Sequence, residues 1–140
     1  MNLNYSLQMT TSRLELIPCT LEIAEVVATK NKSQLEKLLG VKVIDDWFAA
    51  EVLDFLPQYT QMLENDPEQL GWGVWLIIHI DDSTLIGDLG FGGKPDQQGT
   101  VEMGYEMLPA YRNQGYAFEA VQALVNFAFT HPELNRIISN

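Results

Sequence analysis

A change of hydrophobic period between residues 100 and 140 constrains the fold more than any other feature. The run TVEMGYEML (residues 100–108) alternates apolar and polar side chains, which is typical of a half-buried strand. Across residues 117–128 the apolar side chains recur every three or four positions, as in an amphipathic helix. A short apolar run then follows His131 and Pro132. A strand, a helix and a second strand form a crossover, so we expect the last strand to pair in parallel with an earlier one.

The start of the chain predicts one strand followed by helices. Residues 13–18 alternate apolar and polar side chains and end at a proline, which favours a first strand. Thr20 is suited to cap a helix that begins directly after it. A second helix is expected over residues 33–39, with Gly40 as its C-cap.

A third helical segment is expected before the middle of the chain. Asp45 or Asp46 is positioned to cap a helix that starts near Trp47. We expect Pro57 to break this helix or to start the next piece, because proline lacks a backbone N–H. The segment Asn-Asp-Pro at residues 65–67 should close the helical region.

Three further runs predict an antiparallel meander. They cover residues 73–80, 85–93 and 100–108, and short turn-forming segments separate them. The expected fold is therefore α+β, with a mixed but mainly antiparallel sheet and flanking helices in a single domain. That domain covers residues 1–140 and comprises a strand and helices at about 12–66, the meander at about 73–108, a loop and helix at about 109–131 and a final strand at about 134–139.

Composition limits the classes of partner. The formal net charge of −11 argues against a nucleic-acid surface and is compatible with cationic partners. One cysteine allows no internal disulfide, and two distant histidines predict no metal site. The sequence shows no signal peptide and no apolar run approaching the roughly 20 residues of a membrane span. We therefore expect a cytoplasmic protein with no membrane contact.

The junction YRNQGYAFEA (residues 111–120) carries the strongest functional signal. Free N–H groups and the helix dipole at a helix start favour an oxyanion such as phosphate. Gly115 permits close approach of a ligand, Ala117 keeps the first turn slim and Arg112 adds positive charge. The alternative is a capped strand-to-helix turn with an exposed arginine. The sequence contains no P-loop pattern, and the cluster Gly90, Gly92 and Gly93 predicts a bulge or bend.

With this junction in view, the chain resembles the GNAT acyltransferases, and among them the ribosomal-protein N-terminal acetyltransferases. The matching stretches are TSRLELIP, LIGDLGF, VEMGYEMLPAYRNQGYAFEAVQALVNFAF and LNRIIS, so that the resemblance covers roughly residues 11–140. The third stretch contains the acetyl-CoA motif Q/R-x-x-G-x-G/A, in which Arg112, Gly115 and Ala117 occupy the defining positions. The resemblance implies an acyl-CoA N-acyltransferase fold whose sheet opens a slot for the cofactor.

The resemblance also implies a cosubstrate and the residues that contact it. The cosubstrate would be acetyl-CoA, with no metal, and the acceptor a primary amine on a small molecule or a protein N-terminus. The pantetheine arm would bond the backbone of Met107 and Leu108. The pyrophosphate would rest on the amides of the junction, which are those of Arg112, Asn113, Gln114, Gly115, Tyr116 and Ala117.

An attacking ammonium must lose a proton, so a base or a water chain is required. Glu102 is the first candidate because some family members carry a catalytic glutamate at this place, and Glu106 lies on the same strand face. Either glutamate can instead be a solvated or ion-paired carboxylate. Tyr105 should face the core. In the family, this third helical segment forms one wall of the acceptor site. Its aromatic residues here have a spacing that favours core packing instead; they are Trp47, Phe48, Phe55 and Tyr59.

The family pattern continues past the last predicted strand with one helix and two strands, which often supply an acid for the leaving thiolate. Three explanations are open: a fragment, completion by another copy in a homodimer, or a relative that binds without catalysis. The alternative function is thus a non-catalytic or truncated acyl-CoA-binding module. A sensor should tolerate Glu102→Gln, whereas an enzyme that uses this base should not.

Overall fold

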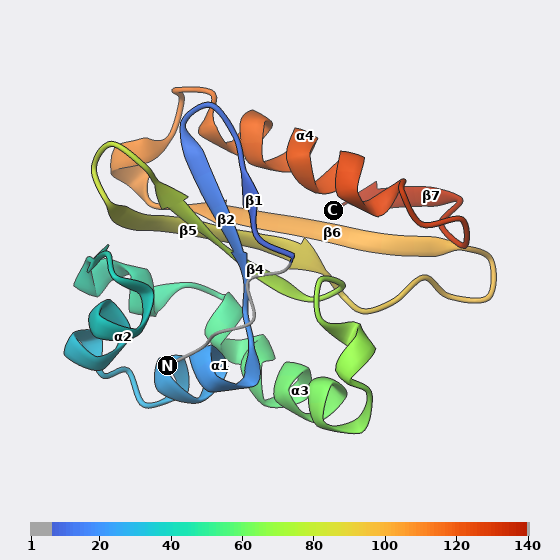
Figure 1. Ribbon diagram of the computed structural model, residues 1–140, viewed down its shortest axis with the longest axis horizontal. Coiled ribbons are helices and arrows are strands. Elements are labelled where there is room, and N and C mark those ends of the chain that lie inside the picture. Colours follow the sequence, from blue (N-terminus) through green and yellow to red (C-terminus); the bar gives the residue numbers. More distant parts are fainter. Residues whose placement is uncertain (1–6, 140) are drawn as a thin grey trace.

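The computed structural model describes residues 7–139 and forms one mixed sheet with helices on both faces (Figure 1). The seven-stranded sheet has the order β1-β2-β4-β5-β6-β7, and β3 pairs in parallel with β5. Its strands are β1 (Met9–Thr10), β2 (Leu14–Pro18), β3 (Lys42–Val43), β4 (Val74–His79), β5 (Thr84–Phe91), β6 (Thr100–Met107) and β7 (Arg136–Ser139).

Helices α1, α2 and α3 lie on one side of the sheet, and α4 lies on the other (Figure 1). The α-helices are α1 (Leu21–Ala28), α2 (Lys32–Leu39), α3 (Val52–Asn65) and α4 (Tyr116–Ala128). Three short 3₁₀ helices join them: η1 (Asp45–Ala49), η2 (Pro67–Gln69) and η3 (Pro109–Tyr111). This arrangement confirms the predicted α+β fold and the antiparallel meander of β4, β5 and β6.

The parallel pairing predicted for the last strand is confirmed. β7 runs beside β6 with Thr100 opposite Arg136 and Met103 opposite Ser139. α4 provides the crossover between them, as the change of period indicated. The crossover places the start of α4 at the end of β6, so the junction loop lies at the edge of the sheet.

The predicted caps of the first two helices are confirmed. The Thr20 hydroxyl accepts a hydrogen bond from the Ile23 N–H at the start of α1. Gly40 ends α2 with a left-handed backbone (φ 71°), a conformation that glycine adopts without strain.

The third helical segment differs from the prediction. Asp45 and Asp46 lie inside η1 and cap nothing, because the chain becomes extended at Ala50 before α3 begins. Pro57 does not break α3, which continues through it. Pro57 lies on the exposed side of that helix, where water can satisfy the carbonyl that lost its partner.

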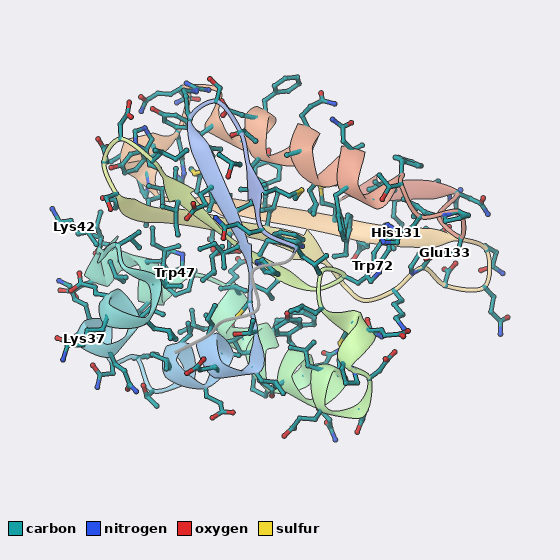
Figure 2. All side chains as sticks on the ribbon, viewed as in Figure 1. Lys37, Lys42, Trp47, Trp72, His131 and Glu133 are labelled. Atoms are coloured by element: carbon teal, nitrogen blue, oxygen red, sulfur yellow. The ribbon has the colours of Figure 1, made fainter. Side chains whose placement is uncertain are left out.

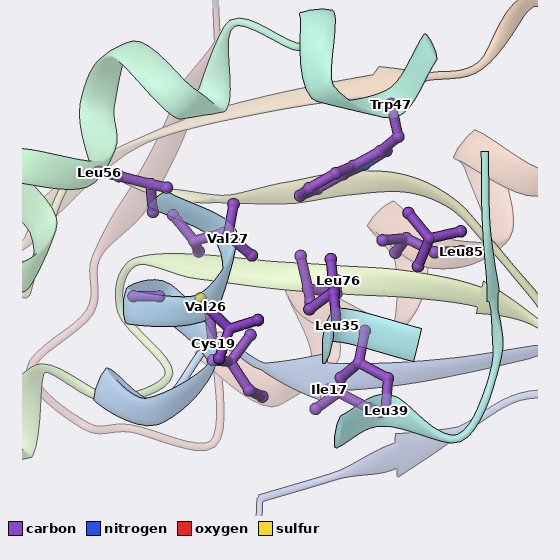
Figure 3. Packing of buried hydrophobic residues seen from close by; sticks show 14 of the residues in the cluster. Ile17, Cys19, Val26, Val27, Leu35, Leu39, Trp47, Leu56, Leu76 and Leu85 are labelled. Atoms are coloured by element: carbon purple, nitrogen blue, oxygen red, sulfur yellow. The ribbon is translucent and has the colours of Figure 1, made fainter. Parts of the chain in front are cut away.

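Two apolar clusters hold the layers together, one on each face of the sheet. On the side of α1, α2 and α3, the Trp47 indole reaches from η1 into a cluster that contains Leu76 (Figure 3). Tyr59 is fully buried there, and its hydroxyl donates to the Cys19 carbonyl oxygen at 2.6 Å. Trp47 and Tyr59 are therefore core residues, as their spacing favoured.

On the other face, α4 covers the second cluster. Trp72 and Trp75 are both buried within it, and the rings of Trp72 and His131 lie side by side with centroids 4.8 Å apart (Figure 2). Tyr105, expected in the core, is instead 59% exposed. It shares the apolar face of β6 but lies beside an open cavity rather than beneath α4.

Candidate functional site

The junction between β6 and α4 forms a tight loop. Asn113 (φ 63°) and Gly115 (φ 84°) both adopt the left-handed backbone conformation. Glycine reaches this region without cost, and asparagine does so more easily than most residues. These two residues reverse the direction of the chain directly before Tyr116, the first residue of α4.

This loop leaves a row of backbone donors free. In the described part of the chain, the N–H groups of residues 113–118 donate no hydrogen bond. The first amide of the region with an internal partner is that of Glu119, which donates to the Gly115 carbonyl oxygen at 3.0 Å. Consecutive free amides at a helix start, together with the helix dipole, suit the oxygens of a pyrophosphate.

Arg13 braces the loop from the N-terminal strand. One of its terminal nitrogens donates to the Gln114 carbonyl oxygen at 2.9 Å, and its Nε donates to Glu119 at 2.7 Å. Its guanidinium also lies over the ring of Tyr116, 4.3 Å from the centroid. Partial burial opposes ionisation of Glu119, but hydrogen bonds from Thr11 and Arg13 lower the pKa of its carboxyl below the usual value.

Tyr116 links the loop to the interior of the protein. Its hydroxyl lies 2.9 Å from His79 Nε2, and both side chains are buried. His79 Nδ1 accepts a hydrogen bond from the Asp82 N–H, which fixes the ring. Sequence reasoning assigned no role to Arg13, because nothing local showed that residues about a hundred positions apart would meet.

Arg112 folds back onto the preceding strand. Its Nε donates to the Met107 carbonyl oxygen at 2.9 Å. Arg112 and Gly115 then line a cavity of ≈ 440 Å³ beside the loop, which also borders Tyr105 and Phe118. Four of the six predicted phosphate residues therefore line one space with the exposed Tyr105, whereas Gln114 and Tyr116 do not line it; the four are Arg112, Asn113, Gly115 and Ala117.

Alternate residues of β6 direct their backbone N–H and C=O groups to opposite edges of the strand. Leu108 donates its N–H to the Ile86 carbonyl oxygen, and Gly92 donates to the Glu102 carbonyl oxygen, so even-numbered residues of this strand face β5. Because the direction alternates, Tyr105 and Met107 turn their backbone groups toward the edge where β7 lies. The N–H of Leu108 is used inside the sheet, so the structure favours Tyr105 and Met107 over Leu108 for an edge contact.

A cleft of ≈ 330 Å³ lies on the α3 side of the same strand, and Glu102 and Glu106 both line it. Gly104 lies between these glutamates, and a β-carbon added there would meet no atom within 4 Å. A second cavity, on the β7 side, also borders Gly104. Gly104 therefore borders both spaces. Along β6, Glu102 lies two positions before Gly104 and Glu106 lies two positions after it.

The comparison with protein families decides the assignment. A family model described as an acetyltransferase (GNAT) domain matches residues 13–140. The chain belongs to the GNAT acetyltransferases. The predicted fold and the predicted enzyme class are both confirmed.

Individual relatives agree with this assignment. The uncharacterized N-acetyltransferase YjdG of Bacillus subtilis is 29% identical over 127 residues, covering 91% of this chain and 75% of that protein. A solved acetyltransferase of Salmonella typhimurium, described as modifying the N-terminal serine of ribosomal protein L7/L12, is 16% identical with a TM-score of 0.58, covering 92% of this chain and 71% of that one. The microcin C7 self-immunity acetyltransferase MccE, solved with acetyl-CoA and AMP, is 16% identical with a TM-score of 0.56, covering 92% and 69%.

This GNAT domain contains one buried carboxylate that sequence reasoning missed. Asp88 of β5 is only 7% exposed, lies opposite Glu106 in the sheet and lines the α3-side cleft. Its Oδ2 atom is buried and has no hydrogen-bond partner in the described structure. Burial raises the pKa of Asp88 to about 7, and the negative charges of Glu106 and Glu51 act in the same direction. The available signal was a charged residue inside the apolar run LIGDLGF.

The predicted glutamates differ in their surroundings. Glu106 is half-buried and accepts a hydrogen bond from the Glu51 N–H at 3.0 Å, so its carboxylate is held in place. Glu102 is exposed, and no hydrogen bond to its carboxylate is found in residues 7–139. Glu102 is therefore free to turn toward a ligand in the cleft.

The described residues contain neither a metal site nor a membrane-spanning helix. Within residues 7–139, no three His, Cys, Asp or Glu side chains are grouped closely enough to hold a metal ion. None of the helices in that range is both long and apolar enough to cross a membrane.

Proposed function

We propose that this GNAT domain transfers the acetyl group of acetyl-CoA to a primary amine. The observation that carries the proposal is the row of free amides at residues 113–118, held in a loop that Arg13 and Tyr116 brace. A turn needs only one or two such donors, whereas a pyrophosphate uses several. The pyrophosphate would lie on these amides, and Arg112 would add positive charge beside them.

The pantetheine arm would run along the β6 edge toward Gly104. Tyr105 and Met107 direct backbone groups to this edge, and Gly104 borders the cavities on the two sides of the strand. The thioester would lie there, within reach of an amine in the α3-side cleft. Holding two reactants at one point supplies much of the rate in such transfers.

The reaction is direct attack. The ammonium first loses a proton to a carboxylate, and the neutral nitrogen then attacks the carbonyl carbon of the thioester. A C–N bond forms, the C–S bond breaks with its electron pair on sulfur, and the thiolate takes a proton from solvent. Glu102 is the proposed proton acceptor because it is free and borders the cleft. The backbone N–H of Tyr105 is a suitable donor to the developing oxyanion.

The loop is tested by calorimetric titration of acetyl-CoA into the parent chain and two matched variants. Gly115→Asp and Gly115→Asn have nearly the same shape, and both residues tolerate the left-handed backbone. Only the aspartate places a negative charge where the pyrophosphate would lie. We expect binding by the parent and by the asparagine variant, and about a hundredfold weaker binding by the aspartate variant. Equal binding by both variants contradicts the proposed phosphate site.

The proton acceptor is tested by following release of free coenzyme A thiol during transfer to an amine. Glu102→Gln should lower the rate about a hundredfold without changing acetyl-CoA affinity. The same change at Glu64, an exposed residue on α3 outside the cleft, should have no effect. An unchanged rate for Glu102→Gln assigns the proton to another group or to water.

A further inference from the structure

The α3-side cleft contains more negative charge than acetyl transfer requires. Its walls carry the carboxylates of Glu51, Asp88, Glu102 and Glu106, and no lysine, arginine or histidine lines it. One proton acceptor is sufficient for the proposed reaction. The other carboxylates therefore need a separate explanation.

None of these four carboxylates has a positive partner among the described residues. Among residues 7–139, no basic side chain lies within salt-bridge distance of any of the four. Like charges gathered in one place repel each other and destabilise the folded state. Other carboxylates of the chain do find such partners; Asp66, for example, pairs with Lys94 at 2.7 Å. Four carboxylates without such a partner line this one cleft.

Asp88 shows that a ligand is expected at this place. Its side chain is more than nine-tenths buried and lines the cleft, yet its Oδ2 has no donor in the described structure. An unpaired buried carboxylate oxygen is costly, and functional sites are where such groups are retained. A positively charged donor in the cleft would satisfy the oxygen and relieve the repulsion from Glu106 and Glu51.

The shape and the remaining walls of the cleft define the kind of cation. Three of the carboxylates are spread along β6 and β5, and the fourth, that of Glu51, directly precedes α3. No group of three such side chains in the described chain could hold a metal ion. Gly104 and Glu106 lie two positions apart, which is about 7 Å along a strand. Val52, Phe55 and Phe91 supply apolar surface in the same cleft. Separate charges with apolar surface in the same cleft suit an aliphatic chain that carries an ammonium at each end.

We propose that the acceptor is an aliphatic diamine or longer polyamine, with one amine at Gly104 beside Glu102 and a distal ammonium held by Asp88 and Glu106. This inference rests on the proposed function, because it names the acceptor of the same reaction. It adds a binding role for Asp88, which would contact the distal ammonium and not the reacting nitrogen.

The test compares putrescine with n-butylamine, which has the same carbon chain and lacks the second ammonium. Each is titrated into the parent chain by calorimetry without acetyl-CoA. We expect putrescine to bind at least about tenfold more tightly, because only the dication engages both ends of the cleft. The preference should grow between about pH 6 and about pH 8 as Asp88 ionises, with proton release visible as a dependence of the heat on the buffer.

Three variants make the result specific. Asp88→Asn should remove most of the preference for putrescine. Glu51→Gln should reduce it; Glu51 is exposed, so this change tests the cleft charge without altering a buried residue. Glu64→Gln, which removes one charge outside the cleft, should retain the preference.

The outcomes separate this inference from the proposed function. Equal affinity for putrescine and n-butylamine overturns the diamine assignment, as does a preference that survives both cleft variants. If acetyl-CoA binds and putrescine shows no advantage, the diamine assignment alone fails. If putrescine is preferred and acetyl-CoA does not bind, the transfer reaction fails, and the acceptor role fails with it.

Discussion

Replacement of Asp88 by asparagine should stabilise the protein, and the gain should increase with pH. The pKa of Asp88 is raised from 3.8 to about 7 in the folded chain. A raised carboxyl pKa means that the folded state binds the proton more tightly than the unfolded state does. The contribution of Asp88 to the free energy of unfolding is therefore fully present below about pH 4. It decreases as the pH rises toward about 7 and is constant above that.

The magnitude follows from the difference between the two pKa values. A shift of about three units, at about 1.4 kcal/mol per unit, makes the ionised carboxylate cost roughly 4 kcal/mol of unfolding free energy above pH 7. About half of that cost is already present near pH 5.5. Asparagine has no such ionisation. Its advantage over aspartate should therefore grow by about 2 kcal/mol between about pH 5.5 and about pH 8.

The measurement is urea unfolding of parent and Asp88→Asn at these two pH values, followed by circular dichroism. Glu64→Gln is the control, because this exposed residue lies outside the cleft. Its difference from the parent should not change with pH. An asparagine variant that is less stable than the parent at about pH 8, or whose advantage is the same at both pH values, would refute the reasoning.

Three further changes test the brace, the sheet and the cleft. Arg13→Ala removes the contacts to Gln114, Glu119 and Tyr116; we expect about 1 kcal/mol lower stability in urea unfolding and roughly tenfold weaker acetyl-CoA binding by calorimetry. Gly90→Ala should lower the unfolding free energy by about 3 kcal/mol, because the new β-carbon would overlap the Gly73 carbonyl oxygen, whereas Gly92→Ala meets open space and should cost less than about 1 kcal/mol. Gly104→Val should leave the melting temperature nearly unchanged but lower the transfer rate at least about tenfold, since its side chain would project into the cleft.

The elements that depend on local pattern were predictable. Apolar runs between turn-forming segments identified β4 and β5, and the periods of two and 3.6 identified β6 and α4. The order of strand, helix and strand identified the parallel pairing of β7. Thr20 and Gly40 acted as caps for the same reason, because capping involves only neighbouring residues. The junction at residues 111–120 was singled out from its own composition.

Features that depend on tertiary packing were not predictable. Burial of Trp47 and the extended backbone at Ala50 separate η1 from α3, which the sequence suggested would be one helix. Tyr105 is at a position that alternation assigns to the core, yet α4 does not cover it. The contact of Arg13 with the loop joins segments that are distant in sequence.

Asp88 owes its position to an irregularity in β5. Strict alternation would put Asp88 on the face of Ile86, against α4, because the two residues are two positions apart. The pairing with β4 shifts there: Ile77 lies opposite Gly87, but Ile78 lies opposite Leu85, so Ile86 is the extra residue of a bulge.

The bulge reverses the alternation, so Leu89 joins Ile86 in the cluster beneath α4, while Asp88 turns to the α3 side and meets Glu106. A strand without this bulge would place the carboxylate in an apolar core. One extra residue in β5 thus converts a position that should be hydrophobic into the charged wall of the cleft, which is the strongest structural argument that the wall has a ligand.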